Sequence, residues 1–181
     1  MTSGPALALV GQVEYPYNIR SNVNVFSGLV LIGPDTDATT VDGITIGVAN
    51  STFPGHGSFE GNFIQGFRDN IVIGDNVFMM TFRNLHSLDA HRYGLNYVGT
   101  TNTGENISIF GGSMSDCINA GGTSVALYVP STSAGPDIFL YGVSFSYNDY
   151  AFDINAGNTS FTSCHFENKT NNVMGKVKYT G

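Results

Sequence analysis

Two aspartates, Asp89 and Asp116, lie one repeat apart in a sequence pattern that recurs along this chain. If each repeat forms one layer of stacked strands, the two side chains belong to adjacent strands, about 4.8 Å apart. Glycoside hydrolysis uses two carboxylates, about 5–5.5 Å apart for retention and about 6.5–9.5 Å apart for inversion. The pair therefore predicts a catalytic acid and base, because crowded like charges raise one pKa. The alternative is two corner aspartates that hydrogen-bond their own turns.

A second group of ionisable side chains fills the connector DAHRYG, residues 89–94. A polysaccharide lyase needs a base that removes the proton beside a uronate carboxylate and a cation that neutralises that carboxylate. His91 or Tyr93 could be the base, and Arg92 or Arg83 the cation. The alternative is a solvated loop in which an arginine pairs with an aspartate.

Asp149 lies near the same line in a later repeat, and Asp69 lies near it in an earlier one, with a one-residue slip. An exposed tyrosine can stack on a sugar ring and offer its hydroxyl group, so we expect Tyr147 and Asp149 to bind substrate. The other tyrosines of the repeats divide between this role and core packing; they are Tyr97, Tyr128, Tyr141 and Tyr150. His86 and His165 fall at equivalent but separated positions, and His56 has no evident partner. We predict no metal site and no cofactor.

The elements that must position these residues are short strands repeated between Gly57 and Val173. Each copy has an apolar anchor, a small or apolar residue three positions later, and in most copies a second apolar run after a polar turn. A period of this kind is typical of a solenoid, in which each repeat buries its apolar face only by stacking on its neighbours. It predicts an all-β right-handed parallel β-helix with short strands and loops of variable length. The anchors are Phe63, Phe82, Ile109, Leu140 and Phe161.

The composition favours the same fold class and excludes some partners. Charged residues make up 12% of the 181 residues, about half the usual ~25%, and glycine, asparagine, serine and threonine are abundant. Such a chain has many turn formers and few helix formers. With 7 basic residues and a net charge of −7, a nucleic-acid partner is not expected, because phosphate binding needs clustered Lys and Arg.

The chain is expected to form one solenoid domain over residues 21–175, preceded by a capping segment (1–20) and ending in a truncated or disordered stretch (176–181). No apolar stretch reaches the ~18 residues of a membrane span, so membrane insertion is not expected. The first residues lack the basic start of a signal peptide. We expect a fragment of a longer protein, with Cys117 and Cys164 as free thiols.

The stretches GENISIFGGSMSDC and DIFLYGVSFSYND combine short strands with Asn/Gly corners. In this texture, from about Asn22 to Val173, the chain resembles the pectate-lyase-like β-helices, and among them most the central domain of bacteriophage tailspikes and capsule depolymerases. The resemblance implies a homotrimer, on the virion or extracellular, that binds and cleaves bacterial capsular or O-antigen polysaccharide. Hydrolysis is the first expectation; a lyase and a non-catalytic structural or adhesion solenoid are the alternatives.

Overall fold

The computed structural model describes residues 5–9, 24–37, 39–47, 57–101 and 104–167. Within these ranges the chain is all-β, with sixteen strands, parallel pairing between them and no helix. The predicted fold class is confirmed to this extent, and the architecture is consistent with a β-solenoid. The rest of the predicted capping segment, the predicted end at 176–181, and His56 lie outside the described residues.

The strands form two sheets, of six and ten strands. The six-stranded sheet, sheet A, contains β1 (Leu7–Leu9), β4 (Ile44–Ile46), β7 (Asp69–Ile73), β9 (Tyr93–Tyr97), β11 (Val125–Val129) and β14 (Tyr150–Ile154). The ten-stranded sheet, sheet B, contains β2 (Asn24–Ser27), β3 (Val30–Ile32), β5 (Gly57–Glu60), β6 (Phe63–Gln65), β8 (Thr81–Leu88), β10 (Ile107–Ser115), β12 (Asp137–Tyr141), β13 (Ser144–Ser146), β15 (Asn158–Thr162) and β16 (His165–Glu167).

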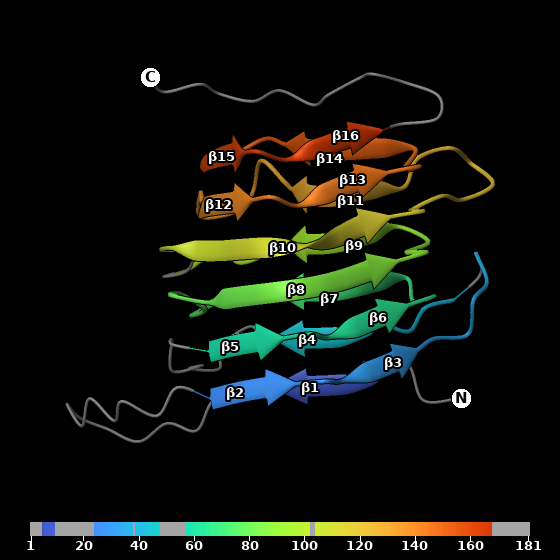
Figure 1. Ribbon diagram of the computed structural model, residues 1–181, viewed down its shortest axis with the longest axis horizontal. Helices are drawn as coiled ribbons and strands as arrows, with labels where there is room; N and C mark the ends of the chain where they lie inside the picture. The colour runs from blue at the N-terminus through green and yellow to red at the C-terminus, as the bar shows by residue number, and fades with distance from the viewer. Residues whose placement is uncertain (1–4, 10–23, 38, 48–56, 102–103, 168–181) are drawn as a thin grey trace.

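Figure 1 shows the two sheets as two layers, with consecutive strands of the chain filling one level after another. We call each level a rung: one strand of sheet A followed by one long or two short strands of sheet B. The first rung is β1–β3 and the sixth is β14–β16. Each rung hydrogen-bonds the next through parallel ladders, so every loop between strands falls at the same few corners of the stack.

Sheet B bends in the middle of every rung at a residue with a left-handed backbone. In the third rung this residue is Asn84 (φ 49°) and in the sixth it is Ser163 (φ 53°). Glycine adopts this conformation freely, and asparagine tolerates it better than most residues. This requirement explains much of the Gly and Asn content between the short apolar runs. The equivalent residues of the other rungs are Gly28, Gly61, Gly111 and Gly142.

An apolar ladder fills the space between the sheets. Four of the five predicted anchors belong to it, and one does not. Phe82, Ile109, Leu140 and Phe161 occupy equivalent positions on successive rungs, as predicted. Phe63 does not: it pairs with His86 after the bend, and Phe59 takes the anchor position opposite Phe82. The sequence FEGNF carries two phenylalanines, and only the bend at Gly61 decides that the first of them points into the core. Phe59 stacks on Phe82 with ring centroids 5.1 Å apart.

Buried asparagines satisfy backbone groups where the rungs turn. The Asn148 side chain accepts a hydrogen bond from the backbone N–H of Cys117 (3.0 Å) and donates one to the carbonyl of Met114 (3.0 Å). Asn62 does the same between Leu29 and Phe26. A buried backbone group without a partner is costly, so these side chains are part of the fold and are not available to a ligand.

Candidate functional site

The predicted pair, Asp89 and Asp116, occupies equivalent corner positions on adjacent rungs. Leu88 and Ser115 are partners in the ladder between β8 and β10, and each aspartate is the next residue. Both have left-handed backbones, with φ values of 49° and 56°. The Asp89 carboxylate accepts a hydrogen bond from the side-chain amide of Gln65. The geometry brings the pair together, and it also gives each aspartate the backbone conformation of a turn residue.

Tyr147 continues this column of corner residues on the next rung. Ser146 pairs with Ser115, and Tyr147 follows with a φ of 58°. Tyr147 is 41% exposed, and its hydroxyl group donates a hydrogen bond to Glu167 Oε1 (3.2 Å). That hydrogen bond raises the pKa of Tyr147. The structure therefore places Tyr147 in the same corner column as Asp116, one rung further on.

Asp149 lies apart from this column and is engaged with the backbone. Its Oδ2 atom accepts hydrogen bonds from the N–H groups of Asn119 (3.2 Å) and Ser124 (3.1 Å). The carboxylate thereby fixes the ends of the loop that leads into β11. The substrate-binding role predicted for Asp149 has no support in this geometry.

His91 is hydrogen-bonded to one aspartate of the segment between β3 and β4 and lies near a second, but its Nε2 atom has no hydrogen-bond partner in the described part of the chain. Its Nδ1 atom lies 2.9 Å from Asp37 Oδ1, and its Nε2 atom lies 3.6 Å from Asp35 Oδ1. The other Asp37 oxygen accepts a hydrogen bond from the N–H of Ala120 (3.0 Å). The imidazole is only 11% exposed. His91 thus ties two loops together, and a substrate proton would have poor access to it.

Arg92 is paired with a buried carboxylate, as the alternative interpretation of its connector stated. Its Nε and Nη2 atoms donate to the two oxygens of Asp69, at 2.7 and 2.5 Å. Asn96 donates a third hydrogen bond to Asp69 (2.6 Å). The hydrogen bonds with Asp69 raise the pKa of Arg92. Arg92 therefore compensates a charge of the fold and is not a free cation for a uronate.

Arg83 is separated from the other predicted residues because it lies on sheet B. Its guanidinium carbon lies 4.8 Å from the ring centroid of Phe110, and Glu60 is its partner in the adjacent ladder. Phe110 in turn stacks on Tyr141, with centroids 5.0 Å apart. Arg83 thus belongs to a column of outward side chains on sheet B, whereas Tyr93 lies on sheet A.

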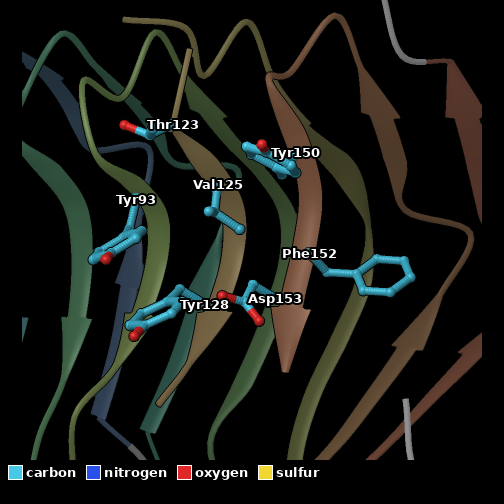
Figure 2. Close-up of a pocket in the computed structure, with 7 residues that line it drawn as sticks. All are labelled: Tyr93, Thr123, Val125, Tyr128, Tyr150, Phe152 and Asp153. Atoms are coloured by element: carbon cyan, nitrogen blue, oxygen red, sulfur yellow. The ribbon is translucent and has the colours of Figure 1, made fainter. Parts of the chain in front are cut away.

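Tyr93 lines the surface cavity of sheet A, whose volume is about 350 Å³, together with Tyr128 and Tyr150, which the sequence left divided between sugar stacking and core packing. The cavity spans three successive rungs, and its lining comes from or next to their sheet A strands β9, β11 and β14 (Figure 2). The rings of Tyr93 and Tyr128 stack with centroids 4.1 Å apart and planes 7° from parallel. In Figure 2 the ring of Phe152 points away from Tyr93 and Tyr128. The lining residues are Tyr93, Thr123, Val125, Tyr128, Tyr150, Phe152 and Asp153.

The lining carries one carboxylate and no basic side chain. Asp153 Oδ1 accepts a hydrogen bond from the Asn155 side chain (2.8 Å). Burial, followed by the neighbouring Tyr128, raises the pKa of Tyr93 to about 12, so this phenol stays neutral at physiological pH. Aromatic faces, hydroxyl groups and a single carboxylate suit the binding of a polyhydroxylated ligand. They do not supply the two carboxylates of a glycosidase.

Sequence alignment of the repeats could not find this cavity. In the ladder Tyr93 pairs with Val125, and Tyr128 pairs with Asn96, so the two stacked tyrosines hold different repeat positions. Tyr128 lies on the rung next to that of Tyr93 and three residues further along its strand, so the two rings meet diagonally. The available signal was weaker: a tyrosine recurs in the second apolar run of several repeats.

Side-chain clusters that could hold a metal ion and membrane-spanning helices are not found in the described part of the chain. No group of three or more His, Cys, Asp or Glu side chains there could hold a metal ion, and no helix there could span a membrane.

Cys117 and Cys164 are both free. Burial raises the pKa of the Cys117 thiol to about 12, which makes it an unreactive core residue.

Comparison with protein-family models, curated proteins and solved structures gives no match. Conclusions about function therefore depend on the cavity, on the corner column formed by Asp89, Asp116 and Tyr147, and on the charges around them.

Proposed function

We propose that this chain is the β-helical domain of a bacteriophage tailspike that binds a bacterial capsular or O-antigen polysaccharide. In this proposal its rungs close into a right-handed parallel β-helix, and three copies associate on the virion or as an extracellular protein. The observation that carries the proposal is the aromatic cavity of sheet A. Its volume of about 350 Å³ lies within the ~300–1,000 Å³ of ligand pockets.

Sugar binding suits the cavity because stacked tyrosines combine apolar faces with hydroxyl groups. The solenoid supports an extended ligand, since equivalent side chains recur at each rung along its length. The net charge of −7 disfavours a densely anionic partner. A neutral or positively charged glycan meets no such repulsion.

Binding is tested with the intact chain and a panel of capsular and O-antigen polysaccharides, using calorimetry on the best ligand. Tyr128→Ala is expected to weaken binding about tenfold, equivalent to ~1.4 kcal/mol, because it removes a stacking face. Tyr141→Ala is the matched control, since Tyr141 is a tyrosine on sheet B that also stacks on a neighbouring aromatic ring. Binding that survives Tyr128→Ala unchanged, or a panel without any ligand, would refute the proposal.

Cleavage of the bound polysaccharide is a second candidate function, supported by the column that holds Asp89 and Asp116. In this mechanism one carboxyl group protonates the oxygen of the leaving sugar. The other carboxylate either activates the water that attacks the sugar carbon, or attacks that carbon itself and forms a glycosyl-enzyme that water then hydrolyses. Incubation with the bound polysaccharide should release new reducing ends, and Asp89→Asn and Asp116→Asn should each abolish them. If both variants cleave normally, these residues are not the catalytic pair.

A lyase and a non-catalytic solenoid would each give a different result in the same incubation. A lyase would generate an unsaturated uronate with ultraviolet absorbance, which hydrolysis does not form. The pairing of Arg92 with Asp69 disfavours the lyase because that cation is already compensated. Binding without any product would favour the structural or adhesion solenoid.

A further inference from the structure

The cavity of sheet A lies at one end of a column that contains a paired guanidinium at its other end. The column runs over four successive rungs through Asp69, Tyr93, Tyr128 and Asp153. At its first end, the guanidinium of Arg92 is held by Asp69, with Nη2 to Oδ2 at 2.5 Å. The same guanidinium carbon lies 5.0 Å from the ring centroid of Tyr93. Here a cation is held by one aspartate and one tyrosine face.

At the other end of the column a tyrosine and an aspartate again lie on neighbouring rungs, here Tyr128 followed by Asp153. Tyr93 covers one face of the Tyr128 ring at 4.1 Å. Asp153 pairs with Tyr128 in the next ladder, and Figure 2 shows its carboxylate beside Tyr128 and farther from Tyr93. An aspartate and a tyrosine face therefore border the cavity, and no Lys, Arg or His belongs to its lining.

Asp153 also has hydrogen-bonding capacity left over. Its Oδ1 atom accepts a hydrogen bond from Asn155 (2.8 Å), and among the described residues Oδ2 accepts none. A carboxylate beside aromatic rings attracts an ammonium ion in two ways: by a charge-assisted hydrogen bond and by the cation–π interaction with the ring. Thr123 and Tyr150 add hydroxyl groups to the same cavity. The same carboxylate repels a uronate, a sialic acid or a phosphate.

We propose that this cavity selects glycans that carry a free amino group and binds their ammonium between Tyr128 and Asp153. The inference rests on the proposed polysaccharide-binding function and narrows its ligand to one class: glycans with non-acetylated amino sugars. Arg92 on the opposite side does not oppose such a ligand, because Asp69 compensates its charge.

The test uses two oligosaccharides with the same sugar backbone: a glucosamine tetramer with free amino groups, and its fully N-acetylated form, in which neutral acetamides replace them. Both are titrated into the intact wild-type chain at low and at physiological salt. The free amine is expected to bind at least tenfold more tightly than the acetylated form, and to lose this advantage as salt rises. Equal affinity, or tighter binding of the acetylated tetramer, would overturn the inference without requiring any variant.

Two variants that remove one negative charge locate the effect. Asp153→Asn should weaken binding of the amine about tenfold and leave binding of the acetylated tetramer unchanged. Glu105→Gln makes the same change in net charge at an exposed residue outside the cavity lining, and should affect neither ligand. If both variants weaken binding equally, the selectivity comes from the overall charge and the assignment to Asp153 is wrong.

The result also separates this inference from the proposed function. Bacterial polysaccharides that bind in a Tyr128-dependent way, without preference for the free amine, would refute only the amino-sugar selectivity. Failure of every polysaccharide and both tetramers to bind would refute both.

Discussion

The aspartates of this chain mostly serve its own backbone and side chains. Asp149 accepts two backbone N–H groups, and Asp75 accepts those of Thr100 (2.6 Å) and Thr101 (3.1 Å). Asp69 holds Arg92. Hydrogen bonds to a carboxylate from backbone N–H groups are stronger than neutral ones. The excess of acidic over basic residues is thus partly a consequence of loops whose backbone N–H groups need acceptors. A carboxylate with few such hydrogen bonds, as at Asp153, is a better candidate for ligand binding.

Asp37 should make the protein sensitive to acid. The hydrogen bond from Ala120 N–H, together with that from His91, lowers the pKa of Asp37 below its usual value of 3.8. A lowered folded-state pKa adds stability that is present above the unfolded pKa and is lost as pH falls through the folded value. We therefore expect wild type to unfold at a higher temperature than Asp37→Asn at pH 7, and the difference to disappear well below about pH 3.9.

The measurement is the thermal unfolding midpoint of both proteins between pH 7 and pH 2.5. Glu105→Gln is the control, with no expected difference from wild type near neutral pH. A gap between wild type and Asp37→Asn that stays constant down to the lowest pH would contradict the prediction.

At the scale of strands, the apolar ladder was predictable and the diagonal contacts were not. Four of the five predicted anchors were correct because the side chains of a strand alternate between its two faces, with a period of two, up to the bend. Phe63 was misplaced because the sequence does not mark which of two nearby phenylalanines precedes the bend. The stack of Tyr93 on Tyr128 was not found because it joins unequal repeat positions, which depends on side-chain direction and not on sequence spacing.

Gly112, the residue after the bend of β10, should tolerate substitution less well than Gly142, the bend residue of the next rung. Gly112 has a φ of 85°, and a Cβ atom there would overlap the backbone carbonyl of Leu85 on the rung beneath. Gly142 has a φ of 65°, and a Cβ there would meet nothing within 4 Å. Gly142→Ala should therefore lower the free energy of unfolding by about 1–2 kcal/mol, because alanine must adopt the left-handed conformation. Gly112→Ala should lower it by about 1–3 kcal/mol more, because the added Cβ atom also overpacks the site.

Urea unfolding of the two variants and wild type gives both free energies. The order of the two costs is the decisive result, because both variants place alanine at a positive φ and differ chiefly in the space around Cβ. Equal losses would show that the backbone of the rungs shifts enough to relieve the overlap at Gly112.

At the scale of the whole molecule, the two end rungs are less well buried than the middle. Half-buried apolar side chains that pack against the core include Phe26 and Leu31 in the first rung, and Phe161 and Phe166 in the sixth. On the first rung Val30 and Ile32 are 65% and 70% exposed. Among the described strands, those of each end rung have ladder partners on one side only. Unpaired edges of this kind favour association with another strand.

Association can proceed in two ways that mass distinguishes. Stacking of one end rung on the opposite end of a second copy is heterologous and does not close, so it produces filaments whose mass grows with concentration. Side-by-side association around a threefold axis closes. The proposed tailspike function requires the closed trimer.

We therefore expect light scattering to give a mass of three times 19.3 kDa that does not change with protein concentration. The matched variant Ile32→Lys adds a charge to the exposed patch of the first rung. It should leave the mass unchanged if the trimer forms side by side away from that patch, and lower it if the patch lies in the interface; either result retains the trimer for wild type. A wild-type monomer at all concentrations would contradict the spike proposal, and a mass that rises without limit would show end-to-end stacking instead.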